Sequence, residues 1–244
     1  MSDILSAADA NHWLIAGVVV FLGSCLQGLS GVGLGMVAAP LLLLLLPQLV
    51  PGPLLFISCL LSVLAVRRER ADVDTRGLGY ALTGRFLTSV LAAWTIGFLP
   101  VREMSIVFAL VILGAVALSL TPVRLSPTRP ALFVAGLVSG FMGTLTSVGM
   151  PPMALVYQNE SPARIRASLS GFLAVGALIS IIALAAVSRF GARDILFGLF
   201  LMLPMWLGYR ASTPLAHRVP RETLRVLVVG LSGLAGALLL LRQF

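Results

Sequence analysis

The sequence alternates between long apolar runs and short breaks that contain charged residues, proline or glycine. Ten apolar segments can be separated in this way, and several are shorter than the ~20 residues that cross a bilayer as a helix. Lipid leaves backbone groups without partners unless the chain satisfies them itself, so each run is predicted to be helical. The segments are 11–29, 32–46, 52–66, 77–98, 103–120, 131–143, 146–157, 166–187, 194–209 and 223–241.

Composition indicates that lipid surrounds most of the chain. Hydrophobic residues make up 59% of the 244 residues and charged residues 11%, about half the charged share of a soluble domain. No stretch between the apolar segments is long enough to form a core of its own, so one membrane domain is expected. Residues 1–13 contain Asp3 and Asp9 but no basic residue. A cleaved signal peptide would begin with basic residues, so the first helix is expected to stay in the mature protein.

Two joints between segments are rich in glycine and carry no charge: GLSGVGLG in the first half and GFMGTLTSVGMPP in the second. Superposing them divides the chain into two membrane repeats, 1–122 and 123–244, of five segments each. Because five is an odd number, the second repeat is predicted to be inverted relative to the first, as in many secondary transporters. The predicted fold class is an all-α membrane protein of two inverted repeats, each beginning with a broken or re-entrant helix pair. Three pairs of residues, each 112 positions apart, coincide in this superposition: Gly28 with Gly140, Gly31 with Gly143, and Pro40 with Pro152.

The loop arginines favour ten segments over eight spans in which each broken pair is one helix. With ten segments, twelve arginines fall on one side and four on the other, whereas eight spans divide them nine to seven. Positive charge concentrates in cytoplasmic loops, so both termini are predicted to be periplasmic or extracellular. The twelve are Arg67, Arg68, Arg70, Arg76, Arg124, Arg129, Arg164, Arg166, Arg210, Arg218, Arg221 and Arg225, and the four are Arg102, Arg189, Arg193 and Arg242.

Several other functions find no support. The formal charge of +8 does not indicate nucleic acid binding, because nearly all 17 basic residues lie in these short loops. Cys25 and Cys59 lie inside apolar runs and show no ligand spacing with other residues, so neither a metal ion nor a cofactor is expected. The tetrapeptide GLSG at 28–31 resembles the motif of intramembrane serine proteases. Its serine would need a histidine at the same depth, and His12 and His217 lie outside the apolar core, so no enzyme is predicted.

The two glycine-rich joints are the first candidate site. Paired interruptions at membrane depth mark the substrate site of several transporters, because broken backbone survives there only under protein or beside a wet cavity. Glycine allows close backbone approach, hydroxyl groups supply hydrogen bonds, and the N-terminus of a half-helix favours an anion. The alternative is that these glycines only allow helices to pack closely. The predicted substrate-binding residues of the joints are Gly28, Ser30, Gly31, Gly33, Gly35, Gly143, Thr144, Thr146, Ser147 and Gly149.

Arg85 is the second candidate, because it is the only charge well inside a predicted span. A central arginine costs ~2.5 kcal/mol or more on insertion scales and therefore needs a partner. All nine acidic residues lie in the N-terminal tail or in loops, so none can pair with Arg85 at depth. Two hypotheses follow. Arg85 either caps backbone carbonyls and extends towards the cytoplasm, or faces a cavity and binds a substrate anion.

Two segments, LQGLSGVGLGMVAAPLLLL and GLVSGFMGTLTSVGMPPMALVYQ, resemble the sulfite exporter TauE/SafE family of small bacterial and plant anion transporters. Each has a glycine-rich turn, a run of small residues and a proline-capped apolar helix. The loop RRERADVDTRG and the glycine-containing helix after it are also similar. In the second segment TLTSVG replaces most of the glycines with hydroxyl residues. The resemblance implies secondary transport of sulfite, an organosulfonate or a related organic anion across a bacterial inner membrane.

The sequence therefore predicts a secondary transporter of a small anion and not an enzyme. Two other functions stay open: a passive anion channel on the same scaffold, and a non-transporting membrane subunit of a larger complex. The expected partners are the small anionic substrate and membrane lipid. H⁺ or Na⁺ would serve as the coupling ion, and the sequence is compatible with a homodimer.

Overall fold

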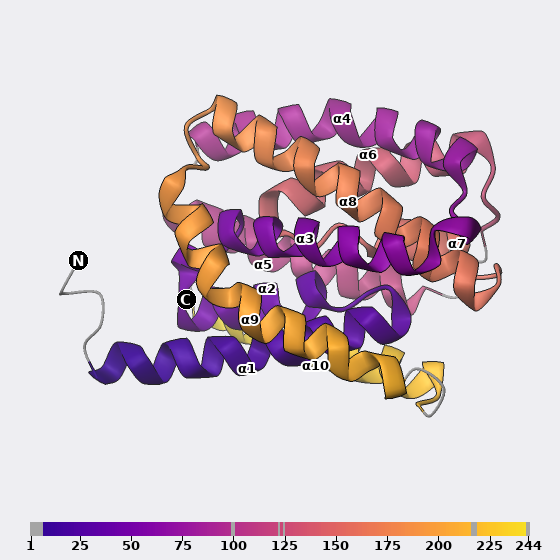
Figure 1. Cartoon of the computed structure of the whole chain (residues 1–244). Coiled ribbons are helices and arrows are strands. Elements are labelled where there is room, and N and C mark those ends of the chain that lie inside the picture. The colour runs from indigo at the N-terminus through magenta and orange to yellow at the C-terminus, as the bar shows by residue number, and fades with distance from the viewer. Residues whose placement is uncertain (1–6, 99–100, 122, 124, 216–218, 243–244) are drawn as a thin grey trace.

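The computed structural model describes residues 7–98, 101–121, 123, 125–215 and 219–242, and every regular element in this part of the chain is helical (Figure 1). Its ten α-helices correspond one to one with the ten predicted segments, which confirms the all-α class. They are joined in places by a π-helix, η2 (Leu34–Ala38), and by the 3-10 turns η3 (Pro47–Leu49) and η4 (Arg70–Asp72). The α-helices are α1 (Ala7–Ser30), α2 (Ala39–Leu45), α3 (Gly52–Glu69), α4 (Thr75–Phe98), α5 (Val101–Leu120), α6 (Arg129–Thr146), α7 (Pro151–Tyr157), α8 (Pro162–Ala186), α9 (Ala192–Leu215) and α10 (Arg221–Leu241).

Among the described residues, six helices are long and apolar enough to cross a membrane: α1, α4, α5, α8, α9 and α10. Helices α3 and α6 have 18 residues each. Helices α2 and α7 have only seven residues each and reach ~10 Å at 1.5 Å per residue, which is too short to cross the ~30 Å hydrocarbon core. The chain is therefore a multi-pass membrane protein with one short helix near the start of each half.

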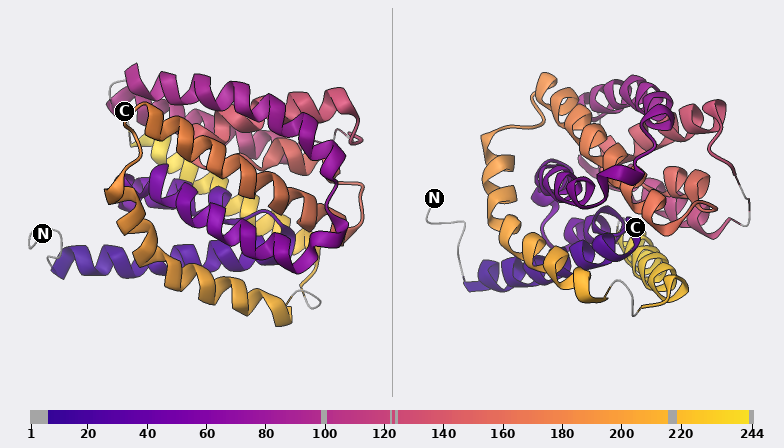
Figure 2. Two further views of the ribbon diagram at one scale, coloured as in Figure 1. Left: turned by 45° about the horizontal axis from the view of Figure 1, so that its top comes forward. Right: turned by 45° about the vertical axis from the view of Figure 1, so that its right-hand side comes forward.

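The helices run lengthwise through one bundle, so its two ends are distinct (Figures 1 and 2). Helices α3, α5, α7 and α9 finish at one end, which we call the arginine-rich end, whereas α1 begins and α10 finishes at the opposite end. Contacts tie the arginine-rich end together, including a bond of 2.9 Å from the Gln158 amide to the Val123 carbonyl. The arginines with described side chains at this end are Arg67, Arg68, Arg70, Arg76, Arg129, Arg164, Arg166, Arg210 and Arg225.

The predicted grouping of the loop arginines is thus found in the described part of the chain. Arg189, Arg193 and Arg242 lie at the opposite end, in or beside the α8–α9 turn and after α10. Arg124 and Arg218 lie outside the described residues, as do the side chains of Arg102 and Arg221.

Glycines set the distance between the long helices. Helix α4 packs along α6, and α1 packs along α9. A Cβ atom on Gly84 would overlap the Phe133 carbonyl, and a Cβ atom on Gly208 would overlap the Phe21 carbonyl. Small residues at such crossings bring backbones into direct contact, which is the main source of helix association where lipid removes the hydrophobic drive.

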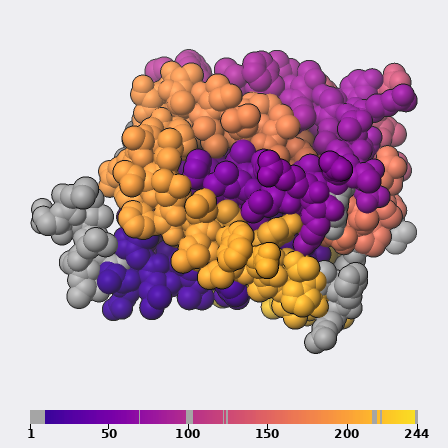
Figure 3. Space-filling model, viewed as in Figure 1, coloured from indigo at the N-terminus to yellow at the C-terminus, as the bar shows by residue number. Residues whose placement is uncertain are grey.

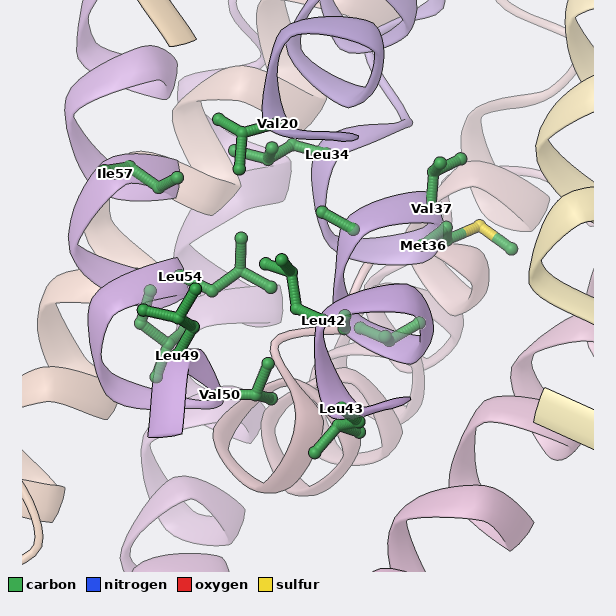
Figure 4. Close-up of a cluster of buried hydrophobic side chains, with 14 of the residues drawn as sticks. Val20, Leu34, Met36, Val37, Leu42, Leu43, Leu49, Val50, Leu54 and Ile57 are labelled. Atoms are coloured by element: carbon green, nitrogen blue, oxygen red, sulfur yellow. The ribbon is translucent and has the colours of Figure 1, made fainter. Parts of the chain in front are cut away.

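The first half begins with a hairpin in which the chain folds back along α1. Gly31 has a positive φ of 81°, and the turn leads into η2 and then α2. The Gln27 side chain holds the returning strand through a bond of 3.2 Å from the Leu34 N–H to its Oε1. Leu34 and the apolar residues of α2 then enter the main core, where they meet side chains from α1 and α3 (Figure 4).

The second half begins with a similar hairpin between α6 and α7. Ser147 ends α6 in the left-handed region, with φ of 64° and ψ of 7°. Its N–H donates to the Gly143 carbonyl at 2.9 Å, which closes the last turn. The Ser139 hydroxyl of α6 donates to the Gly149 carbonyl of the returning strand. In both halves, therefore, a polar side chain of the first helix bonds the backbone of the segment that folds back along it.

Replacing Gly84 with alanine should destabilise the bundle, because the new methyl group would push α4 away from the α6 backbone. We expect a loss of about 1–3 kcal/mol, the usual cost of overpacking, seen as a lower melting temperature in detergent. Gly79→Ala on the same helix is the matched control, since a Cβ atom there has open space around it. A Gly84→Ala protein as stable as the control would contradict the close α4–α6 contact.

Candidate functional site

Arg85 lies near the middle of α4, ten residues after the helix begins, which corresponds to ~15 Å along its axis. Its side chain is 1% exposed and is the largest fully buried side chain of the described chain. None of the ion pairs formed by described residues involves it. A full charge is therefore buried at mid-depth with no carboxylate beside it.

Three glycines surround the Arg85 guanidinium. A Cβ atom on Gly143 would lie 3.1 Å from Nη2, and one on Gly149 would lie 3.0 Å from Nη1. A Cβ atom on Gly176 of α8 would overlap Nε. The guanidinium also lies over the Phe172 ring, 5.0 Å from its centroid, which gives a cation–π contact. Only residues without side chains leave room for the charge between α6, α7 and α8.

Hydrogen bonds satisfy only part of the guanidinium. Nη2 donates to the Ser180 hydroxyl at 3.2 Å, and Ser180 donates to the Gly176 carbonyl at 3.0 Å. Because this uses the one hydroxyl proton of Ser180, Thr144 is the donor in their contact of 2.7 Å. Within the described residues, Nε and Nη1 have no hydrogen-bond partner. No described backbone carbonyl accepts a hydrogen bond from Arg85, so the capping part of the first hypothesis is wrong.

Ser89 adds an unused hydroxyl one turn further along α4. It is fully buried, and its Oγ has no partner among the described residues. Residues four apart lie on the same helix face, so Ser89 and Arg85 share a face of α4. Buried polar atoms without partners are rare and expensive, which makes this face the clearest candidate site in the bundle.

The two hairpin tips meet next to this site. A Cβ atom on Gly35 would overlap the Ser147 carbonyl and lie 3.7 Å from Cα of Val148. Ser147 is one turn after Gly143, which itself faces Arg85. Gly35 is needed here because the two backbones touch, and any larger residue would separate the hairpins.

The structure brings some predicted site residues together and separates others. Gly143, Thr144 and Gly149 surround Arg85 or its hydrogen-bonding serine. Gly28 instead packs against Ser212 of α9. A Cβ atom on Gly31 would lie nearest to Arg166 and Leu169 of α8. A Cβ atom on Gly33 would lie nearest to atoms of α1. These three contacts agree with the packing alternative given above.

The predicted hydroxyl groups are mostly occupied by backbone. Ser30 donates within its own turn, to the Val32 carbonyl at 2.6 Å. Thr146 donates to the Met142 carbonyl at 2.9 Å, and Ser147 donates to the Pro51 carbonyl at 3.1 Å. The half-helices offer few free donors as well. Helix α2 continues from η2, and α7 starts with Pro151 and Pro152, which have no N–H.

Sequence reasoning missed the contribution of α8 to the site. Gly176 and Ser180 contact Arg85, and they are four residues apart on one helix face. Small residues at this spacing were a usable signal. The run ASLSGFLAVGALIS contains several such pairs, however, and nothing local marks the pair that meets Arg85.

Comparison with known proteins identifies the same family that the two glycine-rich joints resemble. Residues 15–239 match the model of the family described as sulfite exporter TauE/SafE, which covers nearly the whole chain. The chain belongs to the sulfite exporter TauE/SafE family. No curated protein and no solved structure matches it. This TauE/SafE member is therefore a membrane protein of a transporter family, and both hairpins and Arg85 lie within the matched region.

A polar cluster lies at the arginine-rich end of the TauE/SafE member, just before the helix that carries Arg85. Asp74, just before α4, accepts from the Tyr157 hydroxyl at the end of α7 at 3.0 Å. It also pairs with Arg164 of α8 at 3.5 Å. Burial alone would raise the pKa of Asp74, but hydrogen bonds from the Gly77 N–H and Tyr157, together with the charge of Arg164, hold that pKa below its usual value.

Asp74→Asn should therefore lower the melting temperature at neutral pH by several degrees. A carboxylate whose pKa is lowered by folding stabilises the protein above its unfolded pKa of about 3.9 and loses this effect as the pH falls through the folded value. Melting curves of both proteins between about pH 3 and 7 should converge at the acid end. Asp72→Asn, two residues away and exposed, should show no such convergence. A gap between parent and Asp74→Asn that is as wide at pH 3 as at pH 7 would contradict this role.

Proposed function

We propose that this protein is a secondary carrier of a small anion, such as sulfite, an organosulfonate or a related organic anion, and that Arg85 binds it. The observation that carries the proposal is the fully buried guanidinium with Nε and Nη1 unpartnered. Two such donors beside a full charge match the oxygens of a sulfite, sulfonate or carboxylate group. An anion at Arg85 would supply both the missing charge and the missing acceptors.

The surroundings of Arg85 suit an anion better than a cation or a neutral solute. Ser89 offers a further hydroxyl on the same face, and the glycines at 143 and 149 leave backbone close to the charge. No acidic residue of the described chain lies at the depth of Arg85, so no carboxylate of the protein competes with the substrate for its guanidinium. Gly35 and Ser147 place the junction of the two hairpins beside the same pocket.

Transport also needs the site to open to each side in turn, and an inverted repeat of residues 1–122 and 123–244 would provide for this. The packing of α1 on α9 and of α6 on α4 supports such a repeat, because equivalent residues make equivalent contacts. Positions in α1 and α6 differ by 112 and positions in α9 and α4 by 124. The matching contacts are Phe21–Gly208 with Phe133–Gly84, and Gly28–Ser212 with Gly140–Thr88.

The distribution of arginine supports an orientation with the arginine-rich end in the cytoplasm and both termini on the other side of a bacterial inner membrane. Helix α1 begins and α10 finishes at the end with few arginines. In this orientation the Asp74 cluster is cytoplasmic, and the Arg85 pocket lies between it and the periplasmic face.

Arg85→Gln should abolish uptake of labelled sulfite or sulfoacetate by proteoliposomes. Arg85→Lys keeps the charge but loses the planar fork, so its apparent KM should rise about tenfold or more, consistent with ~1.5–3 kcal/mol for hydrogen bonds to a charged group. Arg76→Gln in the first turn of α4 is the matched control and should transport like the parent. Melting curves would show that each variant is folded.

Parental uptake by both Arg85 variants would refute the proposed site. Concentrative uptake that an ionophore collapses would identify a carrier, and uptake that only equilibrates would identify a channel. No flux from folded parent protein with any of these anions would favour a non-transporting subunit.

Single cysteines test the orientation. In a background of Cys25→Ser and Cys59→Ser, Asp72→Cys, Ser126→Cys and Asn159→Cys should resist an impermeant thiol reagent added to intact cells. Gly191→Cys, in the exposed α8–α9 turn at the opposite end, should react. Labelling of two or more of the first three from outside would reverse the proposed topology.

A further inference from the structure

A groove of about 960 Å³ runs between α1 and α9 on the flank of the bundle, away from Arg85. Its walls are almost entirely apolar and include Trp13, Leu14 and Val18 of α1 and Phe200 and Leu207 of α9. Arg193, in the first turn of α9, is the one charged residue that lines it. In the view of Figure 3 the flank formed by α1 and α9 faces the reader.

The groove exists because α1 and α9 touch along only part of their length. Their backbones are in contact at Phe21 and Gly208, and the Ser212 side chain packs against Gly28. Towards the opposite end the ribbons diverge (Figure 1). At Gly17 a Cβ atom would still be 3.9 Å from the Pro204 ring, its only neighbour within 4 Å.

At the matching positions of the α6–α4 interface, two side chains lie against each other. At the positions equivalent to Gly17 and Pro204 stand Arg129 and Tyr80, 112 and 124 residues away. There the Arg129 guanidinium lies over the Tyr80 ring, 5.6 Å from its centroid. Helix α6 also begins at Arg129, whereas α1 extends past Gly17 to form the groove wall.

The groove opens onto the membrane. Phe200 is 68% exposed, and Leu14 and Val18 are also exposed, on helices long and apolar enough to span a bilayer. Hydrocarbon therefore surrounds the opening. Trp13 and Arg193 lie at the end of the groove, where an aromatic ring and an arginine are expected at the level of lipid headgroups.

We propose that this groove binds a phospholipid with a net negative headgroup, such as phosphatidylglycerol. One acyl chain lies between α1 and α9 along the Trp13, Val18 and Phe200 side chains. The headgroup phosphate contacts Arg193 at the wide end. A zwitterionic lipid fits the groove less well, because its cationic group would meet the guanidinium.

The charge distribution favours a lipid over a second copy of the chain. A second copy would have to present a ridge of apolar side chains together with an anion at the Arg193 end. The acidic residues at this end whose side chains are described are Glu103 and Asp194, and Asp194 already accepts from the Gly191 N–H at 2.8 Å. A phospholipid supplies both the apolar chain and the anion in one molecule.

Fluorescence quenching by brominated lipids tests the proposal, with Trp13 as a reporter inside the groove. A variant with Trp94→Phe and Trp206→Phe retains Trp13 alone, and one with Trp13→Phe and Trp206→Phe retains Trp94, which is 59% exposed on α4. Each is reconstituted in phosphatidylcholine with about one lipid in ten carrying bromine on its acyl chain. The brominated lipid is either phosphatidylglycerol or phosphatidylcholine.

Brominated phosphatidylglycerol should quench Trp13 at least twofold more than brominated phosphatidylcholine, whereas Trp94 should respond equally to both. Arg193→Gln should remove the preference at Trp13, and Arg189→Gln, at the same end, should keep it. Equal quenching of Trp13 by the two lipids, or a preference that survives Arg193→Gln, would overturn the proposal. Trp13 shielded from both lipids would overturn it in favour of a second copy covering the groove.

Discussion

A charge buried in a bundle surrounded by lipid is the constraint on which the centre of this protein depends. Removing a guanidinium from water costs several kcal/mol unless it is paired and hydrogen-bonded. Arg85 has no carboxylate partner, and its only described hydrogen bond is to Ser180. The glycines at 143, 149 and 176, the Phe172 ring and the Ser180–Thr144 pair all lie around this one group. They surround the guanidinium without neutralising its charge, and Nε and Nη1 keep no partner among the described residues.

Under the proposed repeat, the two halves differ at the position of Arg85. If α4 and α9 are equivalent, Tyr209 occupies the position of Arg85, 124 residues on. The Tyr209 hydroxyl donates to the Leu64 carbonyl at 3.4 Å, and Arg68 lies over its ring. The Tyr209 hydroxyl therefore has a partner within the protein. At the position that holds the buried Arg85 in one half, the proposed repeat places a hydrogen-bonded tyrosine in the other.

Much of the fold could be predicted because the signals were local. Apolar runs and proline or glycine breaks located all ten helices. Their ends were less certain, since α9 continues through Arg210 to Leu215, past the predicted limit at 209. Arg85 was identifiable because a lone charge in an apolar run is rare.

The packing role of Gly28 could not be predicted from the local sequence. A glycine that packs against Ser212 and one that faces a ligand have the same neighbours in sequence. Ser180 and Gly176 were missed for a related reason. Only the crossing of α8 over α4 decides which small residues meet the guanidinium, and that crossing is a property of the whole bundle.

Helix α7 runs from the surroundings of Arg85 to the arginine-rich end. Just before its start, Gly149 lies against the Arg85 guanidinium, and at its finish Tyr157 bonds Asp74. Asp74 in turn immediately precedes α4, the helix that carries Arg85. Helices α4 and α7 are thus joined at both ends, across a seven-residue helix only ~10 Å long. Asp74 and Tyr157 belong to different halves of the chain, so their bond joins the halves at the arginine-rich end. Arg85 and the glycines at 143, 149 and 176 join the same two halves at mid-depth. Because α4 takes part in both contacts, the group proposed to bind the anion lies on the helix that holds the two halves together at both levels.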